Sequence, residues 1–163
     1  MAEGEFALVR ATLETALPKS TVPTKTGATA LEHDVVTYLA DAAANAGDAT
    51  AARSYATRAE ALATSYGHPL YLGIARRALG IAERLEGNSE LAESRLRQAL
   101  LGFQQLGTRW QVGRTLVELG RLEISRRLPQ AARELFETAL AEFEALGATP
   151  DADRTREALA LLS

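Results

Sequence analysis

The chain has 163 residues, no cysteine and a formal charge of -3, made up of 18 basic and 21 acidic side chains. Its length suits one domain with its own core, while the lack of cysteine excludes disulfides, thiolate nucleophiles and cysteine-bound metals and favours the cytoplasm. The balanced charge offers no general attraction to nucleic acid, and no apolar run approaches the roughly 18 residues that span a bilayer, so we expect neither nucleic acid nor a membrane as a partner.

Residues 1–17 are expected to form a short amphipathic helix, and residues 18–29 a polar linker that begins at Pro18. The apolar residues of this helix recur at three- and four-residue spacings: Phe6, Val9, Leu13 and Leu17. We expect the helix to cap the rest of the fold. The second choice is an arm that reaches a groove in the same or another molecule, because exchange of an arm is a low-cost route to a dimer. The first few residues also fit a cloning remnant.

Residues 30–163 are expected to form a single helical repeat domain. Short turns with glycine, asparagine, aspartate or proline separate the predicted helices, which cover residues 31–46, 49–65, 69–86, 89–106, 109–127, 129–146 and 149–162. Asp48 and Asn88 stand where a side chain can cap the next helix, and Pro69 and Pro129 stand in first turns, which tolerate a missing N–H. The last helix has no partner after it, and we expect it to cover the apolar end of the array.

Between Gly67 and Gly147 the chain repeats itself at an offset of forty residues. The residues that coincide at this offset are Leu79-Gly80 with Leu119-Gly120, Ala92 with Ala132, Ala99 with Ala139, and Phe103 with Phe143. A period of about 20 to 50 residues is typical of a solenoid, in which stacked units share a continuous core. The residues that repeat are therefore expected in the core, and those that vary between copies are expected to carry the function.

The spacing from Leu-Gly in the first helix of a pair to alanine, a bulky residue and alanine in the second resembles the tetratricopeptide repeat. Its two good copies are Leu79-Gly80, Ala92, Leu96, Ala99 and Leu119-Gly120, Ala132, Phe136, Ala139. A third copy, over residues 31–65, is degenerate because Ala40 replaces the glycine and Ala56 the bulky residue. The forty-residue period and the absence of the late proline depart from the common repeat of about 34 residues, and HEAT-type repeats are the structural competitor.

The resemblance implies that residues 30–163 form a tetratricopeptide-like domain, an all-α, right-handed alpha-solenoid of about three helix pairs with a C-terminal capping helix. The forty-residue variant resembles arrays in large bacterial signalling ATPases, cyclases and transcription regulators. Glycine in the first helix of a pair lets the second approach closely, which is the physical reason for the pattern.

No motif for catalysis is present: the sequence has no phosphate-binding loop, no zinc-type histidine pair and no nucleophile elbow. Its two histidines, His33 and His68, are expected at the surface, one near a helix start and one in a turn. We therefore predict that the protein is not an enzyme and has no catalytic residues, no metal site and no cofactor.

In arrays of this type the first helix of each pair lines the inner, concave surface. The resemblance places eight candidate partner-binding residues there: Ile74, Arg77, Ile81, Arg84, Arg114, Val117, Arg121 and Ile124. The first pair adds an acidic end with Asp34, Thr37, Asp41 and Ala44. A mixed apolar and cationic groove suits an acidic amphipathic helix or extended peptide, because arginine pairs with carboxylates in a bidentate geometry. The alternative is that these arginines are ordinary solvated faces. Trp110 is expected to pack in the core rather than to contact a partner.

The function expected from these features is a non-catalytic protein-interaction module that binds a partner peptide or helix in its concave groove. The alternative is a structural domain of a larger regulator, which self-associates through the N-terminal arm or the ends of the array. A third hypothesis is a sensor array for a small peptide signal. Each rests on the resemblance, because repeat arrays of one fold serve many unrelated partners.

Overall fold

The computed structural model describes residues 11, 15 and 28–162, and this part of the chain is helical between short turns. Its helices are α2 (Ala28–Ala46), α3 (Ala49–Ser65), α4 (Pro69–Leu85), α5 (Ser89–Gln105), α6 (Arg109–Ser125), α7 (Pro129–Ala145) and α8 (Thr149–Ala160). From α3 onward each helix begins at the predicted residue and ends within two residues of the predicted end. The helix and linker predicted over residues 1–29 lie outside the described residues, apart from residues 11, 15, 28 and 29, and α2 already begins inside the predicted linker.

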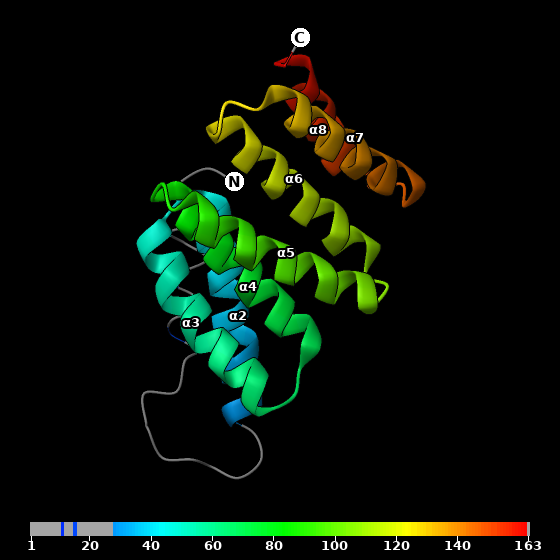
Figure 1. The fold of residues 1–163 in the computed structure, drawn as a ribbon. Coiled ribbons are helices and arrows are strands. Elements are labelled where there is room, and N and C mark those ends of the chain that lie inside the picture. The colour runs from blue at the N-terminus through cyan, green and yellow to red at the C-terminus, as the bar shows by residue number, and fades with distance from the viewer. Residues whose placement is uncertain (1–10, 12–14, 16–27, 163) are drawn as a thin grey trace.

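The helices stack as three antiparallel pairs, α2/α3, α4/α5 and α6/α7, and α8 lies against α7 at the C-terminal end (Figure 1). The all-α solenoid predicted from the repeat is therefore confirmed. We call the surface made by α2, α4 and α6 the inner face; it carries Asp41, Arg77 and Arg114. Arg114 on α6 reaches Asp41 on α2 although α4 packs between these two helices, so this face is concave.

Close contact between the two helices of a pair depends on glycine opposite a large side chain. A Cβ atom added at Gly80 would lie 2.7 Å from the Leu96 side chain, and one added at Gly120 would lie 2.6 Å from the Phe136 ring. Two further pairs, about two turns earlier on each first helix, repeat this arrangement and were not predicted: Gly73 with Phe103 and Gly113 with Phe143, at 2.6 and 2.7 Å. Phenylalanine and leucine therefore fill the space that glycine leaves.

The first pair departs from this size relation at both positions. At the positions of the two glycines it has His33 and Ala40, and at the positions of the two large residues it has Ala63 and Ala56. All four are buried, with exposed fractions of 5% or less. At the first position the larger residue is on the first helix, as His33, and the smaller on the second, as Ala63, whereas at the other position both residues are alanine.

One charge pair between neighbouring pairs of helices has opposite sign at the two successive junctions of the stack. Arg53 on α3 donates to Glu83 and Glu86 at the end of α4. One repeat later, Glu93 on α5 accepts from Arg126 at the end of α6, so both charges are reversed. If the repeats stacked in another order, like charges would meet at this position, so the charge pairs favour the observed order.

The predicted caps are confirmed in part. Asp48 accepts a hydrogen bond from the Ala51 backbone N–H at 2.9 Å, as an N-cap should. Asn88 occupies the N-cap position of α5 but makes no capping bond, and its amide donates to Glu83 at 2.8 Å instead. Pro69 and Pro129 lie in the first turns of α4 and α7, as predicted.

Arg127 has a backbone φ of 61°, in the left-handed region that the other turns of the array fill with glycine. We expect Arg127→Gly to raise the free energy of unfolding by about 0.5 to 1 kcal/mol, because glycine has no Cβ to strain there but loses more chain entropy on folding. The midpoint of urea unfolding measures this change, with an unchanged m-value. The reverse substitution, Gly107→Arg (φ 65°), should destabilise the protein; a stabilised Gly107 variant would contradict the explanation.

Candidate partner-binding face

The centre of the inner face is filled by Arg77, whose side chain is only 1% exposed. Its guanidinium donates to the Asp41 carboxylate at 2.8 Å and to the Gln111 side-chain oxygen at 2.5 Å. It also lies 5.4 Å above the centre of the Phe103 ring, which adds a cation–π contact. Arg77 therefore links the three helices of the inner face, α2, α4 and α6, and its side chain is not accessible to solvent.

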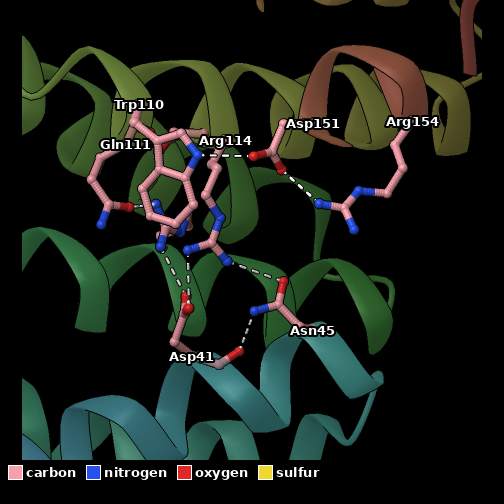
Figure 2. A network of polar contacts seen from close by, with 9 residues as sticks. Asp41, Asn45, Trp110, Gln111, Arg114, Asp151 and Arg154 are labelled. Carbon is pink, nitrogen blue, oxygen red and sulfur yellow. Dashed lines mark hydrogen bonds and ion pairs between the residues drawn. The ribbon is translucent and has the colours of Figure 1, made fainter. Parts of the chain in front are cut away.

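Arg114 makes the second link across this face (Figure 2). It points from α6 toward α2, where it donates to Asp41 at 3.0 Å and to the Asn45 side-chain oxygen at 3.2 Å. Burial on its own would raise the pKa of Asp41, but the two guanidiniums of Arg77 and Arg114 lower it below its ordinary value. The carboxylate of Asp41 is thus held ionised at neutral pH and joins the three helix pairs.

Trp110 extends this network to the last helix. Its ring lies beside the Arg114 guanidinium at 4.8 Å, and its indole N–H donates to Asp151 on α8 at 2.9 Å (Figure 2). Arg154 donates to the same carboxylate at 2.8 Å. The indole is 42% exposed, so the expectation that Trp110 packs in the core is wrong. Because α8 supplies an acceptor for the indole N–H, the ring can stand at the surface with its polar edge satisfied.

A second cluster lies nearer the C-terminal ends of α4 and α6. The Glu118 side chain is 7% exposed and accepts from Arg121 at 2.5 Å and from Arg84 at 3.3 Å. The Arg121 side chain is 52% exposed, and the buried Nε of Arg84 has no hydrogen-bond partner. Two guanidiniums therefore share one carboxylate, which leaves positive charge and donor capacity at this point of the inner face.

The eight candidate residues differ in their access to solvent. Three are buried: Ile74, Arg77 and Ile81. Three are partly exposed: Arg84, Arg114 and Val117. Only Arg121 and Ile124 among the eight are exposed. The binding role of all eight stays a prediction, but a partner can reach the buried three only if the array opens.

One exposed neighbour of these residues was missed from the sequence. Leu85 is 41% exposed and follows Arg84, and it occupies in α4 the position that Asn45 occupies in α2, whose side chain reaches the inner face. The forty-residue offset from Asn45 was the signal that could have found it. We use the name docking patch for Arg84, Leu85, Arg121 and Ile124.

The two carboxylates of the predicted acidic end of the inner face have different partners within the protein. Asp34 accepts a hydrogen bond from the Tyr71 hydroxyl at 2.6 Å, which raises the pKa of that tyrosine. Thr37 and Ala44 are buried, and Asp41 is paired as described above. Repulsion of an acidic partner is therefore reduced at Asp41, where two guanidiniums bind the carboxylate.

His33 also departs from expectation. It was predicted at the surface, but it is 5% exposed and packs among the rings of Tyr66, His68 and Tyr71. The reason is the reversed size relation between His33 and Ala63 in the first helix pair, where His33 takes the position of a buried glycine. His68, by contrast, is exposed in the turn before α4, as predicted.

Among residues 28–162, no group of three or more histidine, aspartate or glutamate side chains is placed to hold a metal ion. No helix in the same part of the chain is long and apolar enough to cross a membrane. A hollow of about 560 Å³ lies between α5 and α7, on the side away from the inner face. Of its three carboxylates, Glu93 and Glu123 are paired with Arg126, and Glu134 accepts a hydrogen bond from Gln130.

No protein-family model matches the chain, and no curated protein matches it in sequence. Among solved structures it is similar to the crystal structure of BtubC (BKLC) from P. vanneervenii, with a TM-score of 0.61 over 98% of this chain and 74% of that one. The fold is that of a helical repeat. The sequence identity to BtubC is 19%, so the similarity shows only that the two proteins share a fold.

Proposed function

We propose that the chain is a non-catalytic protein-interaction module of the tetratricopeptide type, which binds a partner segment on its inner face. Support for the repeat type comes from the spacing of Leu-Gly to alanine, bulky residue and alanine, and from the burial of these positions. Gly80 and Gly120 are opposite Leu96 and Phe136, as the pattern requires for close helix pairing. The forty-residue period remains a departure from the common repeat.

The observation that carries the binding proposal is the docking patch. Leu85 and Ile124 are 41% and 44% exposed, and they accompany two guanidiniums that share the single carboxylate of Glu118. An aliphatic surface next to incompletely paired arginines suits a segment that brings both an apolar side chain and a carboxylate, since a charge-assisted bond from arginine is among the stronger hydrogen bonds.

The rest of the inner face limits where this partner can bind. Arg77 and Arg114 are already bonded to Asp41. Neither can bind a carboxylate of the partner without breaking the network that joins the helix pairs. A partner that lies along the inner face would pair with Arg121 and Arg84 and would contact the exposed ring of Trp110. The preferred ligand is thus an acidic amphipathic helix or extended peptide.

Selection of binders from a random peptide library displayed on phage tests this function. We expect enrichment of peptides that combine aspartate or glutamate with leucine, isoleucine or an aromatic residue, because these complement the docking patch. Selection against Arg121→Gln protein under the same conditions should lose most of these sequences. Absence of enrichment over a blank surface, or enrichment of basic peptides alone, would contradict the proposal.

A cytoplasmic location, the absence of catalysis and self-association through the ends of the array stay predictions. A partner-binding module and a self-associating domain differ in which surface is used: the docking patch binds a peptide in the first, whereas in the second the ends of the array or the N-terminal arm contact another copy of the chain and the docking patch has no separate ligand. Peptide binding to protein that sedimentation shows to be monomeric would favour the first.

A further inference from the structure

The two histidines lie together at the junction of α2, the turn after α3, and α4. The His33 ring is T-shaped to the rings of Tyr71 and His68, with centres 4.6 and 5.4 Å away, and the His68 ring stacks on Tyr71 at 4.0 Å. Tyr66 at the end of α3 lies 5.9 Å from the His33 ring. The His33 ring thus packs against three rings, two from the α3–α4 turn and one from α4.

His33 suits this place only in its neutral form. It is 5% exposed, and its buried Nε2 atom has no hydrogen-bond partner. A proton on the ring would make both nitrogens donors, and one of them would then be a buried, charged donor without an acceptor, which is costly. The second histidine, 5.4 Å away, would add repulsion whenever both rings are charged.

The surrounding charges do not remove this cost. Asp34 on α2, whose charge favours protonated His33, is already hydrogen bonded to the Tyr71 hydroxyl. Glu32, also on α2, is paired with Arg58 on α3. From the turn and α4 the titratable groups that face His33 are His68 and Tyr71, and from α3 the nearest is Tyr66. Tyr38 on α2 lies close enough to Tyr71 to act on it.

We propose that His33 is an acid-sensitive latch, which holds the N-terminal part of α2, before Asp41, against the α3–α4 turn and α4 while its ring is neutral and releases this part when it binds a proton. Release removes the ring from between Tyr66 and Tyr71 and weakens the Tyr71–Asp34 hydrogen bond beside it. The N-terminal end of the inner face is then remodelled, while the Asp41 network and the pairs beyond it keep their contacts.

The pH range follows from the sign of the linkage. Burial lowers the pKa of His33 below 6.5, the nearby His68 lowers it further, and Asp34 opposes both. The folded protein therefore binds fewer protons than the unfolded chain, so stability is intact above pH 6.5 and falls as the pH drops below it. Asp41, Glu83, Glu93 and Asp151 have pKa values lowered below 3.8 or 4.5 and do not titrate in this range.

Thermal unfolding at pH 7.5 and 5.5 tests the latch, because the chain has no histidine besides His33 and His68. We expect the wild-type Tm to fall by roughly 3 °C or more between these pH values, and His33→Phe to lose at least half of this fall. Phenylalanine keeps a ring among the three neighbours and gives up no hydrogen bond at Nε2. The matched variant His68→Phe, at the exposed ring, should keep most of the fall. An equal fall in wild type and His33→Phe, or its loss only in His68→Phe, would overturn the proposal.

Two measurements on the wild-type protein keep the proposal testable if His33→Phe does not fold. In an NMR titration the His33 ring should titrate below pH 6.5, together with chemical-shift changes at Tyr71. Hydrogen exchange, corrected for the intrinsic rate at each pH, should show lost protection at residues 32–38 and 66–71 at pH 5.5, with α6 to α8 unchanged. Titration of His33 at or above pH 6.5, or uniform loss of protection, would rule out the latch.

Discussion

Asp41→Ala should lower the free energy of unfolding by about 3 to 5 kcal/mol, because it leaves the Arg77 guanidinium buried without its anion. Arg77 is 1% exposed and cannot turn to water without opening the inner face. Gln111 and Phe103 remain beside it, so the effect is expected at the lower end of this range. Urea unfolding followed by circular dichroism measures the change.

A double substitution separates the lost anion from lost packing. Asp41→Leu with Arg77→Met removes both charges and keeps apolar volume, and it should restore most of the stability, because apolar side chains of similar volume often replace a buried ion pair without loss. Asp153→Ala removes an exposed aspartate that is paired with Arg156 and should change little. A cost below about 1 kcal/mol for Asp41→Ala would show that Arg77 is not held by this pair.

Phe136→Ala should be the second large effect, with a loss of about 3 to 5 kcal/mol in the free energy of unfolding. The ring is 0% exposed, and it fills the space that Gly120 leaves in the facing helix. Gly120→Ala alone should cost about 1 to 2 kcal/mol, because its Cβ would lie 2.6 Å from the ring and the overlap exceeds the gain in helix propensity.

Combining the two substitutions tests whether glycine and ring are matched in size. All three of the closest atoms to a Cβ at Gly120 belong to Phe136, so the overlap disappears once the ring is removed. In the Phe136→Ala protein, Gly120→Ala should therefore be neutral or stabilising by up to about 1 kcal/mol. The double variant then has the alanine pair found naturally at Ala40 and Ala56. Additive losses in this double-mutant cycle would contradict the match.

The helix boundaries and the core could be predicted because local residues determine them. Glycine and proline stand at the turns, and the positions that repeat, such as Ala92 and Ala132, are 0% exposed. Arg127 shows that the pattern tolerates an exception, since it takes a glycine conformation without being glycine. At this level each prediction required only the sequence of one repeat and its copy.

The inner face was less predictable, because its curvature brings together residues from three helices. Arg77 was expected in the groove but is buried, since Asp41 lies 36 residues before it and Gln111 34 residues after it. In a forty-residue repeat a separation of 36 is about one helical turn short of the period, and a separation of 34 is nearly two turns short, so the long Arg77 side chain can reach across to both adjacent first helices. An acid and a base at that separation were the signal for an internal ion pair.

His33 was placed at the surface for a related reason. Its neighbours in the sequence suggest a helix start, and only the comparison with Gly73 and Gly113 in the later repeats shows that the position is buried. Such a substitution can be recognised when both helices of a pair are read together, because the loss of the large residue at Ala63 accompanies the gain at His33.

The most direct test of binding at the docking patch is calorimetric titration of one library-selected peptide into three proteins: wild type, Arg121→Gln and Arg97→Gln. Arg97 is an exposed arginine on α5, bonded to Glu93 away from the inner face, and serves as the matched control. We expect Arg121→Gln to weaken the Kd about tenfold or more, as for the loss of one charge-assisted hydrogen bond, and Arg97→Gln to leave it within about twofold. Equal affinity for all three proteins, or a loss confined to Arg97→Gln, would contradict binding on the inner face.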